Sequence, residues 1–184
     1  MRTAIVLAVL LAAAAAAANP YVIELYVDFE PPNAISYIDP APYTMLNAYV
    51  AAELYAPAPV EAISFDLNVW EGTAIVSGSF TPVIPVYQVQ IVENGITVIN
   101  PDCWDTWPVT LGYVPLMTLG PPGLVEIVPH VDNGHSFVTC GDPGETYDYC
   151  YVLHGGIGMM PYDTTYCGNP VEDVTWGAVK ALYR

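Results

Sequence analysis

Apolar residues at every second position are the feature that most restricts how this chain can fold. The clearest case spans residues 63–69, where Ile63, Phe65, Leu67 and Val69 alternate with Ser64, Asp66 and Asn68. Successive side chains of a β-strand point to opposite faces, so this pattern buries one face and leaves the other in solvent. The segment therefore predicts a half-buried strand.

Nine further segments have strand character and are separated by turns rich in Gly, Pro, Asn and Asp. They are residues 21–29, 46–54, 74–80, 83–92, 96–99, 109–119, 124–128, 137–140 and 149–153. Glu93-Asn94-Gly95 predicts a tight hairpin between two of them. Many short strands without a convincing long helix predict an all-β fold, specifically an antiparallel β-sandwich.

Part of the pattern resembles a known family. Val60–Val69, the turn after it and Ala74–Phe80 resemble the early strands of cohesin-type sandwiches. Pro108–Leu111 and Leu116–Leu119 are similar to the apolar strand before a long turn in that family. The resemblance implies an immunoglobulin-like or cohesin-like sandwich. It implies no dockerin partner, because it is carried by strand patterning alone.

The N-terminus predicts export. Arg2 precedes the apolar run Ile5–Leu11, and Ala12–Ala18 offers several small-residue cleavage sites. The run is too short to span a bilayer, so we expect cleavage near Ala18 and no membrane span in the mature chain. The expected organisation is a signal peptide (1–18), a sandwich domain (19–173) and a C-terminal tail (174–184). We expect the protein to be secreted or on the cell surface, with the periplasm as an alternative.

The C-terminal tail is the least sandwich-like segment. Thr175–Arg184 resembles the tail of uncharacterised exported bacterial proteins that end in Thr-Trp-Gly-x-x-Lys-x-Leu-Tyr-Arg, which implies secretion and no known chemistry. One interpretation is a terminal helix or strand that docks on the sandwich. The other is an export, sorting or assembly signal, whose candidate residues are Trp176, Lys180, Tyr183 and Arg184.

Charge is strongly one-sided, with 19 acidic residues against 3 basic ones and a formal net charge of −16. Such a surface repels phosphate backbones and anionic lipids, so nucleic acid is excluded as a partner. A solvated exterior explains the charge, and attraction for divalent cations or a basic partner is the alternative.

Four cysteines in an exported chain predict two disulfides. We favour Cys103–Cys140 with Cys150–Cys167, although Cys140–Cys150 would close a shorter hairpin and the sequence does not choose among the three pairings.

Metal and catalytic motifs are weak. His130, His135 and His154 are the only histidines, and their spacing matches no recognised zinc site. Asp142, Glu145 and Asp148 lie around one Gly/Pro loop and are calcium candidates, but they do not form an EF-hand pattern. No other cofactor is predicted.

An enzyme is not expected. Leu153-His154-Gly155-Gly156 superficially resembles the oxyanion loop of lipases, yet no Gly-x-Ser-x-Gly elbow accompanies it. The glycines are therefore predicted to permit a bulge or tight turn. A secreted hydrolase remains the alternative from a different class.

Aromatic residues are the remaining functional signal. Trp104 and Trp107 flank acidic residues beside Cys103 in a predicted loop, where exposed rings would suit a glycan or a protein interface. The alternative is that both rings pack over the disulfide. The sequence thus predicts a secreted, non-catalytic interaction or structural module whose partner is a protein or glycan at the cell exterior. A carbohydrate-binding module and an assembly subunit that self-associates by donating strand 21–29 are the alternatives.

Overall fold

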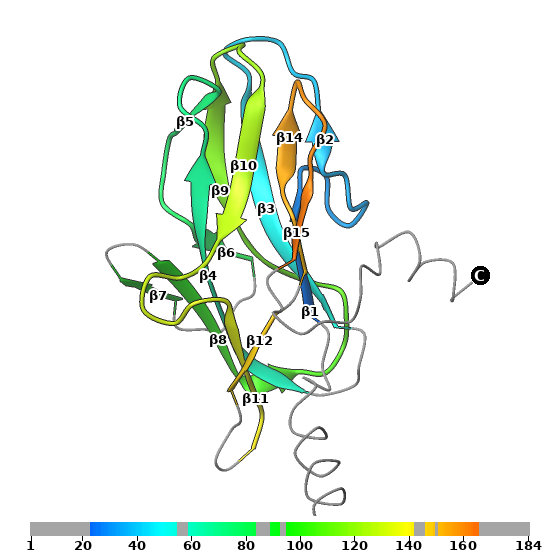
Figure 1. Ribbon diagram of the computed structural model, residues 1–184, viewed down its shortest axis with the longest axis vertical. Coiled ribbons are helices and arrows are strands. Elements are labelled where there is room, and N and C mark those ends of the chain that lie inside the picture. The colour runs from blue at the N-terminus through cyan, green and yellow to red at the C-terminus, as the bar shows by residue number, and fades with distance from the viewer. Residues whose placement is uncertain are drawn as a thin grey trace, which may run out of the picture. The chain divides into compact units, whose positions relative to one another are not determined.

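Two β-sheets stack on each other and enclose a single hydrophobic core in this computed structural model (Figure 1). The structure describes residues 23–54, 59–83, 89–92, 95–141, 146–149 and 151–165, all of which belong to one compact unit, Asn19–Tyr166. No helix occurs in these described segments. The predicted all-β sandwich is confirmed.

Sheet A has seven strands in the order β15-β13-β1-β3-β9-β5, with β6 also beside β9. Their bounds are β1 (Ile23–Asp28), β3 (Met45–Leu54), β5 (Ala74–Val76), β6 (Thr81–Pro82), β9 (Val109–Thr118), β13 (Tyr151–Leu153) and β15 (Asp163–Thr165). The long antiparallel pair β3–β9 forms its centre.

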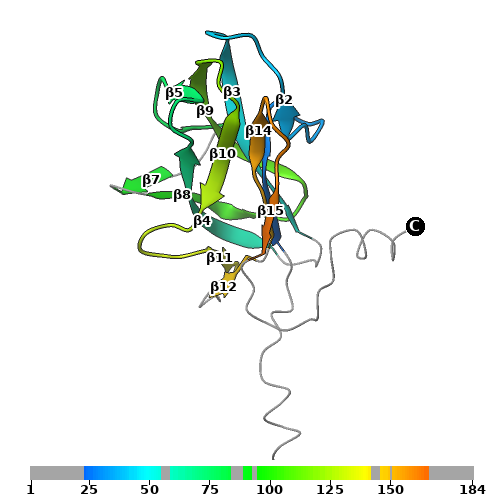
Figure 2. The same ribbon diagram turned by 45° about the horizontal axis from the view of Figure 1, so that its top comes forward.

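Sheet B has eight strands in the order β12-β11-β4-β10-β14-β2, with β8 pairing both β4 and β7. Their bounds are β2 (Tyr37–Ile38), β4 (Val60–Val69), β7 (Val89–Val92), β8 (Gly95–Trp104), β10 (Gly123–Val128), β11 (Ser136–Thr139), β12 (Thr146–Asp148) and β14 (Gly155–Ile157). Figure 2 shows β10, β14 and β2 side by side.

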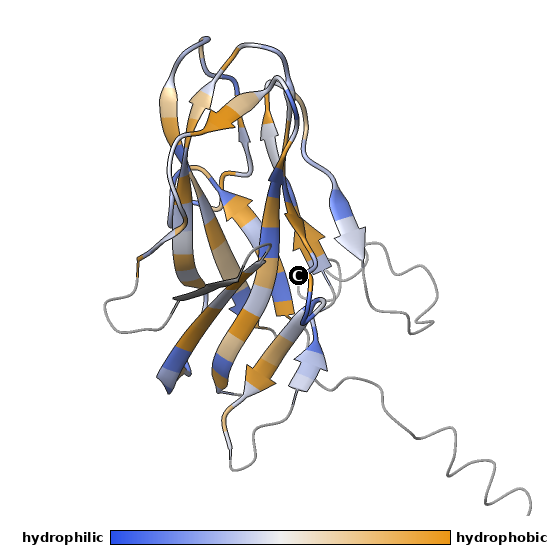
Figure 3. Ribbon diagram, turned by 90° about the vertical axis from the view of Figure 1, so that its left-hand side faces the viewer, coloured by the Kyte–Doolittle hydropathy of each residue, from blue (hydrophilic) through white to orange (hydrophobic). Residues whose placement is uncertain are grey.

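The predicted alternation is visible along the strands, where apolar and polar bands succeed one another (Figure 3). On β4, Ile63 and Phe65 are fully buried, whereas Asn68 is exposed. Buried apolar area is the main stabilising term of such a core. The hairpin predicted at Gly95 is also confirmed, because β7 and β8 pair in register up to Val92 and Gly95.

The sheets are mixed rather than purely antiparallel as predicted. β1 runs parallel to β13, and β14 runs parallel to β2. Parallel neighbours come from distant parts of the chain because they need a crossover connection. Periodicity identifies strands but does not identify such partners.

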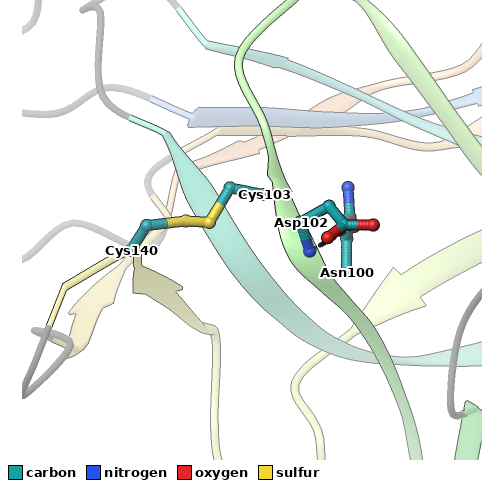
Figure 4. Close-up of a disulfide and its surroundings, with 4 residues drawn as sticks. All are labelled: Asn100, Asp102, Cys103 and Cys140. Carbon is teal, nitrogen blue, oxygen red and sulfur yellow. Dashed lines mark hydrogen bonds between the residues drawn. A yellow bond between two sulfur atoms is a disulfide. The ribbon is translucent and has the colours of Figure 1, made fainter.

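The Cys103–Cys140 disulfide is present, as favoured from the sequence (Figure 4). It links the end of β8 to the residue after β11, with the two Cα atoms 6.3 Å apart. Beside it, the side-chain oxygen of Asn100 accepts a hydrogen bond from the Asp102 backbone N–H at 3.0 Å. The predicted Cys150–Cys167 pair lies outside the described residues.

Strand β1 lies inside sheet A, paired with β3 on one side and β13 on the other. Ile23, Leu25 and Val27 are fully buried. A strand held on both sides within its own sheet is not free to join a neighbour's edge, so the strand-exchange alternative is not supported.

The predicted signal peptide (1–18) and C-terminal tail (174–184) lie outside the described residues, and both stay predictions. Within the part of the chain that the structure describes, no helix has the length and apolar character needed to cross a membrane.

Candidate interaction surfaces

The two predicted ligand-binding tryptophans do not form an exposed pair. Trp104 ends β8 and is 5% exposed within the core, and Trp107 is partly buried against that core. The prediction of an exposed loop is wrong for Trp104, because β8 continues through the acidic segment and carries the indole inward. The structure favours the packing alternative for both rings.

The three histidines are separated and have structural contacts. Nδ1 of His130 accepts backbone hydrogen bonds from Asp132 at 3.1 Å and Asn133 at 3.2 Å, and its ring packs on Gly95. The ring of His135 lies 5.8 Å from that of Tyr149. Among the described residues, no three histidine, cysteine or acidic side chains are grouped to hold a metal ion.

Of the three calcium candidates, the structure describes only Asp148. Asp142 and Glu145 lie outside the described residues, and Asp148 is an exposed residue of β12. Calcium binding there stays a prediction.

The outer surface of sheet A forms an apolar face that the sequence analysis missed. Met45 on β3 lies opposite Met117 on β9, which in turn lies opposite Ile75 on β5. Leu46, Leu116 and Ala74, which adjoin them along the strands, pack on the core, so these three side chains point outward. We define the apolar face as Met45, Tyr49, Ile75, Tyr113, Pro115 and Met117.

This face is uncharged and partly exposed: Met45 and Ile75 are exposed and its other four side chains are half-buried, with the polar Asn47 opposite Pro115. Met45 is 59% exposed and Ile75 is 48% exposed. The rings of Tyr49 and Tyr113 pack at 5.2 Å across the same strand pair. None of the six side chains carries a charge, although the chain as a whole is strongly acidic. Contiguous exposed apolar side chains on a folded domain are typical of a docking surface.

The outer surface of sheet B carries a different arrangement, which we call the carboxylate cluster and define as Asn68, Trp70, Glu126 and Tyr162. Glu126 on β10 lies directly opposite Asn68 on β4, and Trp70 follows β4 on the same face. Tyr162 reaches the cluster from the segment before β15.

Hydrogen bonds converge on the Glu126 carboxylate. Tyr162 donates its hydroxyl to Oε1 at 2.6 Å, and the Asn68 amide donates to Oε2 at 2.8 Å. Burial raises the pKa of Glu126, but hydrogen bonds from Tyr162, Asn68 and Trp70 outweigh it and hold the pKa below its usual value. The carboxylate is therefore ionised at neutral pH.

The buried His154 packs against the cluster through Tyr162. Its Nδ1 accepts the backbone N–H of Ile127 at 3.1 Å, so Nε2 carries the proton and donates to the Thr164 hydroxyl at 2.9 Å. Its ring packs at 4.6 Å against the ring of Tyr162. Burial lowers the pKa of His154, and the nearby Glu126 and Asp163 carboxylates oppose this only in part.

The two glycines after His154 are needed for close packing, not for the bulge or tight turn that the sequence suggested. Both lie in strand β14. A Cβ at Gly155 would approach Val27 to 2.6 Å inside the core. A Cβ at Gly156 would overlap the Met159 carbonyl and the Pro161 nitrogen, so the segment carrying Tyr162 lies against β14.

Sequence reasoning missed both surfaces for one reason. Met45, Ile75 and Met117 lie far apart in the sequence, and only strand pairing brings them together. Trp70 and Glu126 had a usable signal, because each lies on the polar face of an alternating strand. Their convergence with Tyr162 has no sequence signature.

Comparisons with solved structures give cohesin sandwiches. A chain of the Coh-OlpC–Doc435 complex, described as a novel type I cohesin–dockerin complex from Clostridium thermocellum, has a TM-score of 0.54 at 8% identity, covering 77% of this chain and 96% of that one. A chain of the CaDoc0917–CaCohA2 complex has a TM-score of 0.51 at 12% identity, covering 74% and 98%.

The seventh ScaB type I cohesin from Pseudobacteroides cellulosolvens has a TM-score of 0.50 at 8% identity, covering 84% of this chain and 98% of the cohesin. These likenesses show a cohesin-like fold. No protein-family model matches the sequence. No curated protein matches it either.

Proposed function

We propose that this protein is a non-catalytic protein-interaction module that acts outside the cell. The observation that carries the proposal is the apolar face, where exposed Met45 and Ile75 flank Met117 across three antiparallel strands. Leaving such side chains in water forgoes the stabilisation that burial would give, and a partner recovers it. Methionine and tyrosine are also enriched at protein interfaces.

The cohesin-like fold supports this class of function. One of the similar structures, from Clostridium thermocellum, is a type I cohesin–dockerin complex. This chain matches the similar structures in fold and not in sequence, so we propose a protein partner without assigning it to the dockerins.

Mutation of the apolar face tests the proposal. The purified mature chain would be immobilised and exposed to the extracellular and cell-envelope proteins of the producing organism. We expect Met45→Asp with Ile75→Asp to lose a partner that the native chain retains, because two buried charges would be introduced into the interface. The matched control is Val131→Asp, which changes an exposed apolar residue in the turn between His130 and Gly134, away from this face.

A partner that binds the native chain and the control but not the double variant supports the proposal. If every retained protein binds the double variant equally well, the apolar face is not the interface and the proposal is wrong.

Export and sorting are part of the same proposal. We propose that residues 1–18 are removed during secretion and that residues 174–184 serve sorting or assembly. N-terminal sequencing of the native protein should begin near Asn19. Deletion of Val174–Arg184 should change secretion or surface display, and unchanged display would contradict the role of the tail.

A further inference from the structure

We propose that the carboxylate cluster on sheet B is a binding site for a neutral glycan, separate from the apolar face on sheet A. The site combines two exposed aromatic rings with one ionised carboxylate. Trp70 is 40% exposed and Tyr162 is 45% exposed. Tyr162 donates a hydrogen bond to Glu126 at 2.6 Å, and Trp70 follows β4 on the same face as Asn68, the other donor to that carboxylate.

The aromatic rings provide the apolar part of the site. The C–H groups on one face of a pyranose ring form an apolar surface, and a flat ring is the side chain that covers it best. Among the tryptophans that the structure describes, Trp104 is buried and Trp107 is partly buried, whereas Trp70 presents its indole to solvent.

The carboxylate provides the polar part. Hydrogen bonds from Tyr162 and Asn68 fix the position of both Glu126 oxygens and keep the group ionised. A fixed, charged acceptor forms stronger hydrogen bonds with sugar hydroxyls than a neutral one does. The edge contact between Tyr162 and His154 also holds the phenol in place, so little ordering is required on binding.

Charge selects the class of glycan. Glu126 lies within a chain of formal net charge −16, and no basic residue belongs to the cluster. A uronate or sulfated sugar would be repelled by this field, whereas a neutral hexose or pentose polymer would not. The ligand we infer is therefore a neutral polysaccharide.

Affinity gel electrophoresis tests the inference with four neutral probes, namely hydroxyethyl cellulose, barley β-glucan, xyloglucan and galactomannan. We expect at least one of them to retard the purified mature chain relative to serum albumin. Trp70→Ala should weaken this binding by about ten-fold because it removes a ring-sized apolar contact. Tyr162→Phe and Glu126→Gln should each weaken it by a smaller factor, since the rings remain.

Tyr43→Ala is the matched control, because Tyr43 is an exposed aromatic residue outside the cluster. Retardation of the native chain and this control, with loss in Trp70→Ala, supports the site. No retardation by any of the four polysaccharides, or equal retardation of native and Trp70→Ala chains, would overturn it. If circular dichroism shows that Trp70→Ala is unfolded, the retardation of Glu126→Gln relative to the native chain decides the test instead. The double aspartate variant of the apolar face should bind glycan normally, so the two proposals can fail independently.

Discussion

Side chains alternate in the same way on both sheets, but the surface defined on the outside of sheet A is uncharged, whereas the one on sheet B is built around a carboxylate. On sheet A, Met45, Met117 and Ile75 form an uncharged row across three strands. On sheet B, the equivalent outward positions hold Asn68 and Glu126, whose polar atoms are joined by hydrogen bonds. The period-two pattern keeps both outer faces out of the core. Their side chains can therefore differ in chemistry without changing the packing between the sheets.

The comparison shows that each face depends differently on the rest of the molecule. The apolar face needs only its three neighbouring strands. The carboxylate cluster also needs the segment with Tyr162 to lie against β14 and His154 to remain neutral. Changes in that support should therefore affect sheet B and spare sheet A.

The largest expected effect comes from the disulfide that joins β8 and β11, both in sheet B. Replacing Cys103 and Cys140 by serine removes a cross-link over 37 residues of sequence separation. Chain-entropy estimates for such a loop give about 4 kcal/mol of lost stability. Urea denaturation measures the loss of stability. In amide hydrogen exchange, the amides of sheet B should lose protection before those of sheet A. Equal early exchange in β3 and β9 would contradict the asymmetry.

The next effect is that of Gly156→Val. The added side chain would overlap the Met159 carbonyl and displace the segment that carries Tyr162. Overpacking of this kind costs about 1–3 kcal/mol. We expect weaker protection of β14 and β10 and loss of the Tyr162–Glu126 hydrogen bond, with β3 and β9 unchanged. A variant as stable as the native chain in urea would show that the close approach is not needed.

A smaller effect is expected from pH through His154, which is 2% exposed. Its pKa in the folded chain is lower than in the unfolded chain, so the unfolded state binds the extra proton more readily. Its contribution to stability is complete above the ordinary histidine pKa of about 6.5 and is lost as the pH falls through the lower folded value. Protonation also removes the acceptor for the Ile127 N–H.

Thermal unfolding of the native chain and His154→Gln across this pH range measures that contribution. The native chain should lose more stability than the variant between neutral and mildly acid pH. Parallel curves would mean that other groups, including Glu126, account for the acid sensitivity.

The smallest effect on stability is expected from Met45→Lys on the apolar face. The side chain is mostly in solvent, so the free energy of unfolding should change by no more than about 0.5 kcal/mol. Binding of the protein partner should nevertheless be lost, because a charge would enter the apolar contact. Val131→Lys, at an exposed apolar residue in the turn between His130 and Gly134, serves as its control. A large loss of stability would instead show that this face is part of the packed structure.

Most of the strands were predictable, because burial on one face leaves a direct mark on the sequence. Ile63 and Phe65 are buried where the alternation placed them. The disulfide between Cys103 and Cys140 was favoured correctly among three pairings. The burial of Trp104 was not predictable. The residues around it in the sequence are the same whether the strand ends before the indole or continues and carries it into the core.

Alternation alone determined that this chain forms two stacked layers of strands with a buried apolar side on each, because the side-chain period of a strand is a local property of the backbone. Pairing between distant strands decided everything that concerns binding. The parallel contact of β1 with β13, the row from Met45 to Ile75 and the meeting of Trp70, Glu126 and Tyr162 all join residues far apart in sequence. Such contacts are selected by the packing free energy of the whole fold, and no short stretch of sequence contains that information.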